Sequence, residues 1–300
     1  MKNGNIRTSL LAIVLAAAIP PAAATEAVTV PATFQHDLAA DTERPTYRLF
    51  VAVPPDYEAQ QDRRYPVTYV LDGNVTFPFA VSMQRMFALF RETPEMIVVG
   101  VGYPVQFFPE TIASRWRDLT PWSNRAVDAS EAEKLGPGLR SGGGPEFLRH
   151  LREEVIPFVD AHYRTTDDRA LYGHSFGGLF ALYALFEAPD LFRRYAISSP
   201  SLNFTPDPVF ALEAAYAEAH DALPARVFLS YGSEEHQIAM PVARLVDILE
   251  KREYQGLELQ AHVFQDETHV SVFPAALSRA VRWLYAAPAG DLQAKPVPAE

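Results

Sequence analysis

Residues 170–182 read ALYGHSFGGLFAL and place a Gly-x-Ser-x-Gly motif between two apolar runs. The short run before the motif is typical of a strand, and the longer run after it is typical of a helix. A serine on such a strand-to-helix turn forms a nucleophile elbow, in which Gly173 and Gly177 are expected to avoid Cβ clashes. We therefore predict that Ser175 is a nucleophile. The alternative is a chance occurrence of the motif in a loop.

Outward from the elbow, short β-branched or aromatic runs alternate with longer amphipathic segments. Strands are predicted over 46–53, 66–71, 96–101, 170–172, 195–198, 226–231 and 257–264, and helices over 79–91, 145–162, 176–187, 208–220, 241–254 and 272–285. This alternation is typical of an α/β domain with a mostly parallel central sheet flanked by helices. Residues 28–53 are expected to add an antiparallel hairpin at one edge. Together with the elbow, the pattern predicts the α/β-hydrolase fold.

Two segments interrupt the alternation, at 103–139 and around 200–208, and both are rich in proline, aromatic and charged residues. Long irregular segments inside an α/β domain commonly serve as binding loops or lids. We therefore interpret both segments as functional loops.

A serine hydroxyl is a weak nucleophile and needs a base, which in this fold comes after the acid in the chain. His269 fits because it lies between the last predicted strand and the last predicted helix, in a loop at the carboxyl edge of the sheet. His262 falls within a predicted strand, and His236 stands beside the acid candidates. His174 is interpreted as an unconstrained position of the elbow.

The acid is expected directly after the strand 226–231, where residues 231–235 read YGSEE. A carboxylate at this turn can accept the hydrogen bond of the second ring NH of His269 and fix the tautomer. Glu235 is favoured over Glu234, because the acid of this fold commonly stands three places after such a glycine. Alternatively, both glutamates are solvated turn residues, and Ser175 acts with His269 as a dyad.

An oxyanion hole requires two NH donors, one of them from the residue after the nucleophile, which here is Phe176. The other donor comes from the loop after an early central strand, where residues 71–74 read LDGN. We therefore predict that Asn74 is the second donor, although Gly73-Asn74 is also typical of a simple turn.

The N-terminus has the pattern of a secretory signal peptide: Lys2 and Arg7, an apolar run over 10–19, and alanine at 22–24. The run is shorter than the roughly 20 residues that span a bilayer, so an uncleaved anchor is the less favoured alternative and no membrane span is expected in the mature chain. We assign residues 1–24 to the signal peptide, 25–287 to one α/β-hydrolase catalytic domain, and the Ala- and Pro-rich residues 288–300 to a disordered tail.

The chain has 300 residues, no cysteine and a formal net charge of −11, which becomes −13 without Lys2 and Arg7. The lack of cysteine excludes disulfides, a cysteine nucleophile and thiolate metal sites, and with the signal peptide it suits an exported, periplasmic protein. A strongly negative chain argues against nucleic-acid binding. No His-x-x-x-His or Glu-x-x-His cluster stands at helical spacing, so no metal and no cofactor are expected.

Several motifs spread along the chain carry a family resemblance: LDGN at 71–74, RWRDLTP at 115–121, SGG at 141–143, the elbow, SPSL at 199–202 and HVSVFP at 269–274. With them the sequence resembles the esterase D-like "Putative esterase" family of α/β-hydrolases, and more closely its periplasmic siderophore esterases, which open enterobactin- or salmochelin-type trilactones. The resemblance implies hydrolysis through a serine and a histidine, with a less uniform acid. Here SPSL continues with Asn203-Phe204, where look-alikes usually have tryptophans, which alters an expected pocket wall.

Arg115 and Arg117 are candidate substrate-binding residues, because an anionic ferric catecholate needs cationic partners on a protein of negative charge. Arginine can supply bidentate hydrogen bonds and can stack on catechol rings. The alternative is an ion pair with Asp118 that only shapes the loop.

These motifs predict a serine carboxylic ester hydrolase that cleaves a small-molecule ester through an acyl-enzyme, with a ferric-siderophore trilactone as the first candidate substrate. The alternatives are a feruloyl or acetyl carbohydrate esterase and a mycolyltransferase-like acyltransferase, because an alcohol can capture the same acyl-enzyme instead of water. A non-catalytic binding protein with this fold is a further alternative. It is disfavoured because the elbow, the acid turn and the late histidine occur in the required order.

Overall fold

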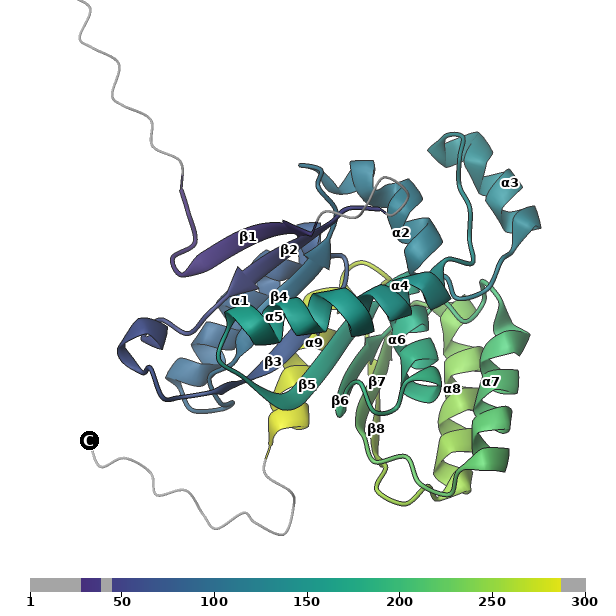
Figure 1. The fold of residues 1–300 in the computed structure, drawn as a ribbon. Coiled ribbons are helices and arrows are strands. Elements are labelled where there is room, and N and C mark those ends of the chain that lie inside the picture. The colour runs from purple at the N-terminus through teal and green to yellow at the C-terminus, as the bar shows by residue number, and fades with distance from the viewer. Residues whose placement is uncertain (1–27, 39–44, 287–300) are drawn as a thin grey trace, which may run out of the picture. The chain divides into compact units, whose positions relative to one another are not determined.

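The computed structural model describes residues 28–38 and 45–286, and its centre is an eight-stranded sheet (Figure 1). The strands are β1 Thr33–Leu38, β2 Tyr47–Ala52, β3 Tyr65–Val70, β4 Ile97–Gly102, β5 Thr165–His174, β6 Arg194–Ser198, β7 Arg226–Gly232 and β8 Glu258–Phe264. Their order in the sheet is β1-β2-β4-β3-β5-β6-β7-β8. β2 pairs antiparallel with both β1 and β4, whereas all pairs from β4 to β8 are parallel. The mostly parallel sheet and the antiparallel hairpin at its edge are thus confirmed.

Helices cover both faces of this sheet (Figure 1). They are α1 Gly73–Leu89, α2 Ile112–Asp118, α3 Arg125–Leu135, α4 Gly144–His150, α5 Ile156–His162, α6 Phe176–Glu187, α7 Pro206–Ala219, α8 His236–Arg252 and α9 Val272–Tyr285. α1 and α9 form one apolar cluster with the sheet, in which Phe77 and Leu277 are buried. The opposite face forms a second cluster, to which α6 contributes Phe180 and α8 contributes Leu245. All six residues of β4 are buried, as expected for a central strand that is covered on both faces.

The predicted helix over 145–162 is divided into α4, one π-helical turn over Leu151–Val155, and α5. Pro157 stands at the start of α5 and lacks the NH that would continue the regular hydrogen-bond ladder. The segment 103–139, expected to be irregular, contains α2 and α3. α3 has no buried residue and α2 buries only Trp116 and Asp118, so neither helix has the apolar periodicity that would have predicted it.

Two helices begin more than one turn earlier than predicted: α1 at Gly73 rather than at 79, and α8 at His236 rather than at 241. Each has a proline in its second turn, Pro78 and Pro241, and each predicted helix began at or directly after that proline. The additional turns lie where the chain leaves β3 and β7, at the edge of the sheet that carries the elbow.

Contacts divide the chain into residues 1–31 and residues 32–300, and the fold described above belongs to the second unit. The predicted signal peptide over 1–24 and the predicted tail over 288–300 lie outside the described residues. None of the helices that the structure describes is both long and apolar enough to cross a membrane.

Candidate active site

Ser175 stands on the sharp turn between β5 and α6, with a positive φ of 60°. Its NH donates to the carbonyl of Ser198 at 3.0 Å, which fixes the turn to the end of β6. A positive φ is rare for a residue with a side chain and occurs where the surrounding structure enforces it, often at functional sites. The predicted strand–elbow–helix geometry is therefore present in the fold.

The two glycines that flank Ser175 are not equivalent. A Cβ on Gly173 would lie only 2.0 Å from the carbonyl oxygen of Gly177, so no side chain fits at 173. A Cβ on Gly177 would meet no atom nearer than 3.5 Å, which is ordinary contact. The expectation that both glycines avoid a Cβ clash was thus wrong for Gly177. The next residue, Gly178, is the second tight position, because a Cβ there would lie 2.8 Å from the carbonyl oxygen of Ser198.

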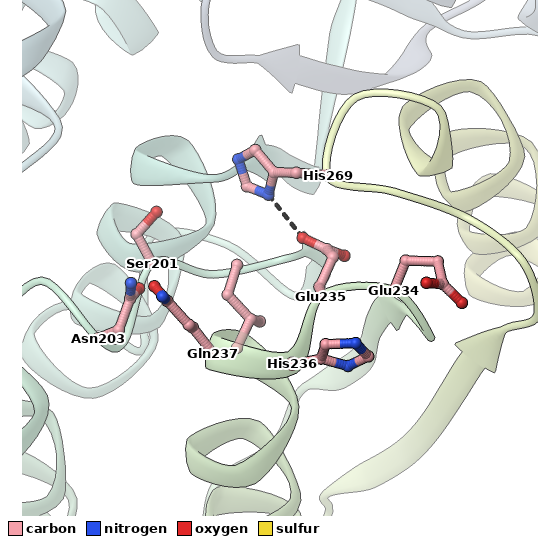
Figure 2. Close-up of a pocket in the computed structure, with 8 residues that line it drawn as sticks. Ser201, Asn203, Glu234, Glu235, His236, Gln237 and His269 are labelled. Carbon is pink, nitrogen blue, oxygen red and sulfur yellow. Dashed lines mark hydrogen bonds and ion pairs between the residues drawn. The ribbon is translucent and has the colours of Figure 1, made fainter.

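Ser175, His269 and Glu235 form a continuous chain of hydrogen bonds. His269 Nε2 lies 2.9 Å from Ser175 Oγ, and His269 Nδ1 lies 2.6 Å from Glu235 Oε1. The three residues follow β5, β8 and β7, respectively, so the parallel strands bring them to one edge of the sheet. Figure 2 shows the contact between His269 and Glu235. The sequence-predicted serine and acid are therefore linked through the predicted histidine.

Glu235 is buried and its carboxylate accepts two further hydrogen bonds, both at 2.6 Å, from the Ser199 hydroxyl and the Gly232 NH. Burial alone raises the pKa of Glu235, but the hydrogen bonds from His269, Ser199 and Gly232 outweigh it and hold the pKa below its ordinary value. Glu235 is therefore ionised at neutral pH. Its competitor Glu234 is exposed, and its carboxylate points away from His269 in Figure 2.

The ionised carboxylate of Glu235 fixes the tautomer of His269. A carboxylate can only accept, so Nδ1 must carry the proton that it donates to Glu235. In the neutral imidazole Nε2 is then the unprotonated acceptor, and the hydroxyl of Ser175 must donate to it. This is the arrangement in which a histidine can take a proton from a serine.

His174 was interpreted as an unconstrained position, and the structure corrects this. Its Nδ1 lies 3.1 Å from the Ser198 hydroxyl, and its ring centroid lies 4.8 Å from that of His269. Burial, with a further contribution from the neighbouring His269, lowers the pKa of His174 to about 4. His174 is therefore a neutral ring packed beside the base. The local sequence around His174 could not predict this contact, because His269 lies almost a hundred residues further along the chain.

Two hollows meet at His269. The first, of about 520 Å³, contains Ser175 and His174 and has mainly apolar walls from Val75, Phe79, Phe108, Val270, Phe273 and Pro274. The second, of about 490 Å³, is lined by Ser201, Asn203, Glu234, Glu235, His236, Gln237 and Ile238 and is more polar (Figure 2). An ester bound at Ser175 can thus place an apolar part and a polar part in different surroundings.

The two predicted oxyanion donors both stand in the first turn of a helix, Phe176 in α6 and Asn74 in α1. NH groups in a first turn have no acceptor within their own helix, so they are available to an anion. The side chain of Asn74 is used elsewhere: its Nδ2 donates to the carbonyls of Tyr103 and Val105, and its Oδ1 accepts from the Tyr103 NH. Only its backbone NH can serve, and this role stays a prediction.

The segment 103–139 packs against the elbow through aromatic rings. Trp116 of α2 contacts Phe176 edge to face at a centroid distance of 5.0 Å, and Phe204 contacts both rings at 5.6 and 5.0 Å. The indole NH of Trp116 donates to Asp128 of α3 at 2.8 Å. α2 and α3 thus hold the residue that follows the nucleophile.

The structure pairs both predicted substrate-binding arginines with carboxylates. Arg115 lines the apolar hollow, but its guanidinium donates to Asp72 at 2.7 and 3.0 Å. Arg117 donates to Asp118 at 2.6 and 2.9 Å, which is the ion pair considered as the alternative, and it lines neither hollow. The charges of both arginines are therefore balanced within the protein. The structure lends no support to an anion-binding role for Arg117, which lies outside both hollows. Arg115 remains a candidate for substrate contact because it forms part of the wall of the apolar hollow.

Sequence reasoning did not assign roles to Asp72, Ser199 and Ser201, which lie in the loops after β3 and β6. Asp72 and Ser199 have positive φ values of 55° and 45°. The Ser201 hydroxyl lies 3.2 Å from that of Ser175. Their positions could have been anticipated, because both loops follow strands that are adjacent to β5 in the sheet and therefore lie beside the elbow.

An elbow, an acid and a late histidine on a sheet of this order define an α/β-hydrolase fold. The chain belongs to the family described as "Putative esterase", whose model matches residues 42–284, and it is an esterase. It is 28% identical over 269 residues to ferri-bacillibactin esterase BesA of Bacillus subtilis, covering 86% of this chain and 91% of that one. It is 31% identical to siderophore triacetylfusarinine C esterase of Aspergillus fumigatus, covering 78% of each. An IroE-like serine hydrolase from Shewanella oneidensis superposes with a TM-score of 0.74 at 25% identity, covering 84% of this chain and 80% of that chain.

Proposed function

We propose that this esterase hydrolyses siderophore esters through an acyl-enzyme formed on Ser175, with His269 as the base and Glu235 as the acid that orients it. The observation that carries the proposal is the unbroken chain of hydrogen bonds from Ser175 through His269 to the buried Glu235. A buried carboxylate on Nδ1 stabilises the imidazolium that forms when the serine loses its proton.

In the first step, Ser175 Oγ attacks the ester carbonyl carbon and its proton moves to His269 Nε2. The carbonyl oxygen becomes an oxyanion, to which the NH groups of Phe176 and Asn74 donate. The bond between the carbonyl carbon and the alcohol oxygen then breaks, and Nε2 returns its proton to the alcohol. In the second step, a water molecule repeats this sequence on the acyl-enzyme and releases the acid.

The substrate class is inferred from the relatives and from the hollows. The two relatives described above are named as esterases of siderophores. The apolar hollow at Ser175 and the polar hollow beside His269 provide separate room for the two halves of such an ester. A lactone keeps its alcohol attached after cleavage, so both halves must be accommodated at once.

The catalytic assignment is tested by replacing the nucleophile. Ser175→Ala is expected to abolish labelling by a fluorophosphonate probe and to lower turnover of p-nitrophenyl acetate by at least about 10³-fold, because no other group forms the acyl-enzyme. A matched control is Ser130→Ala on α3, which removes a hydroxyl far along the chain from the elbow and should change neither readout. Retained turnover in Ser175→Ala would contradict the proposal.

The substrate assignment needs a separate comparison on the wild-type protein. Iron-loaded enterobactin, iron-loaded bacillibactin and methyl ferulate would be assayed side by side by chromatography of the products. The proposal expects the lactones to be cleaved with a higher kcat/KM than methyl ferulate. The opposite order would favour a feruloyl esterase with the same catalytic residues.

We also propose that the protein is exported, on the basis of the basic, apolar and small-residue pattern of residues 1–24. Expression with this segment in a Gram-negative host is expected to give a periplasmic protein whose N-terminus lies close to residue 25. N-terminal sequencing of the fractionated protein checks this, and an intact N-terminus on a membrane-bound protein would support the anchor instead.

A further inference from the structure

A second hydroxyl, that of Ser201, touches the atom that would react. Ser201 Oγ lies 3.2 Å from Ser175 Oγ, and Ser201 is only 8% exposed. Its position is fixed by the backbone, since its NH donates to the Ser175 carbonyl at 3.1 Å and its carbonyl accepts from the Phe204 NH at 3.1 Å. The side chain itself is not needed for these backbone contacts.

The direction of the hydrogen bond between the two serines follows from the tautomer of His269. Ser175 has one hydroxyl proton, and it is used in the bond to Nε2. The contact between the serines can then be a hydrogen bond only if Ser201 donates and Ser175 Oγ accepts. Ser175 Oγ is therefore held between an acceptor, His269, and a donor, Ser201.

The hydrogen bond from Ser201 is expected to affect acylation and deacylation differently. In the free enzyme, Ser175 Oγ is a hydroxyl oxygen that already accepts the bond, so attack on the ester gains little more from it. In the acyl-enzyme, the same atom is the single-bonded oxygen of an ester, which is a weak acceptor. When that ester breaks, Oγ becomes the leaving oxygen and gains negative charge, so the hydrogen bond becomes stronger. Only an interaction that strengthens in the transition state accelerates a step.

Resting on the proposed serine mechanism, we propose that Ser201 is a further catalytic residue, which donates a hydrogen bond to Ser175 Oγ as that oxygen leaves during deacylation. In this step water adds to the acyl carbon and gives a proton to His269 Nε2. The bond between the acyl carbon and Ser175 Oγ then breaks, its electron pair stays on Oγ, and Nε2 transfers the proton to Oγ. The products are the free acid and the regenerated serine.

The position of Ser201 in the polar hollow supports this role. Figure 2 shows Ser201 and Asn203 on one side of this hollow, with Glu235 and His269 on the other. Because Ser201 and His269 line the same hollow, a water molecule in it can reach the base beside Ser201. The apolar hollow, by contrast, would be occupied by the acyl group during this step.

The experiment separates the two steps by stopped-flow measurement of p-nitrophenyl acetate cleavage. The burst of p-nitrophenol reports acylation, and the steady-state rate reports deacylation. In Ser201→Ala, the rate of the burst is expected to stay within about threefold of wild type, and the steady-state rate is expected to fall about tenfold or more, as a hydrogen bond to a charged oxygen implies. The rate of fluorophosphonate labelling, which also depends on attack by Ser175, should likewise change by less than about threefold.

Ser201→Cys supplies a graded comparison, because a thiol is a weaker donor than a hydroxyl. Its deacylation rate is expected to lie between those of wild type and Ser201→Ala. Equal losses in both steps, or no loss in either, would overturn the proposal, since the first would indicate a purely structural role. Ser175→Ala measured in parallel should show no burst at all, and a burst in that variant would instead refute the proposed function.

Discussion

At the scale of single residues, the carboxylate of Glu235 is held in one position by several hydrogen bonds. It accepts three hydrogen bonds, from His269, Ser199 and the Gly232 NH, while being buried. The sequence alone was also compatible with a dyad without an acid. The distance of 2.6 Å to His269 favours the three-residue arrangement and makes the role of Glu235 testable by a near-isosteric change.

Glu235→Gln is expected to lower kcat/KM for p-nitrophenyl acetate by roughly 10²- to 10⁴-fold, because a neutral amide neither stabilises the imidazolium nor enforces the tautomer. Glu234→Gln is the matched control: it makes the same chemical change one residue away on an exposed side chain, and it should leave kcat/KM within about twofold. If both variants kept wild-type activity, Ser175 and His269 would act as a dyad.

At the scale of elements, the turn between β5 and α6 requires the backbone at Gly173 to lie close to the backbone at Gly177. The motif shows two glycines around Ser175, but only Gly173 stands where a Cβ would collide with backbone, at 2.0 Å from the Gly177 carbonyl oxygen. The atoms that it would meet belong to the elbow itself, so a side chain at 173 forces the strand and the helix apart.

Gly173→Ala is accordingly expected to reduce esterase activity by at least about 10²-fold and to lower the melting temperature, because the elbow must open to admit the methyl group. Gly177→Ala adds the same methyl group where the nearest atom lies at 3.5 Å, and it should keep a melting temperature close to that of wild type. Thermal melts and p-nitrophenyl acetate assays of the two variants check this. Equal damage in both would contradict the steric argument.

At the scale of the whole molecule, the parallel sheet gathers loops that are far apart in the sequence. It also holds a half-buried titratable ring beside the catalytic residues, because His174 at the end of β5 packs against His269. The low pKa of His174, about 4, links the folding free energy of the molecule to pH.

Between pH 4 and 6.5, the unfolded chain is expected to bind a proton at His174 that the folded protein does not bind. The free energy of unfolding should therefore rise with pH across this window. His174→Asn should reduce the slope of the unfolding free energy against pH by an amount that corresponds to at most about one proton. Denaturant unfolding at a series of pH values measures this slope, with the exposed His220→Asn as the control. An unchanged slope in His174→Asn would show that this ring is not buried in its neutral form.

Most of the fold could be predicted from the chain itself because strands and core helices have regular apolar patterns. The bounds of α6 and α9 agree with the prediction to the residue, since each follows a clear start signal and carries a continuous or periodic apolar run. The early start of α1 and the helices α2 and α3 could not be predicted, because prolines and charged residues conceal them and tertiary contacts stabilise them.

By itself, the sequence determined the candidate serine, histidine and acid, because local turn chemistry and chain order mark the places where strands end. It did not determine the partners of Arg115, the contact of His174 with His269, or the hydroxyl of Ser201 beside Ser175. Only the tertiary structure decided these, since each depends on how neighbouring strands are aligned and on which charges are buried together. Such alignments arise from packing across the whole sheet and leave no local pattern in the chain.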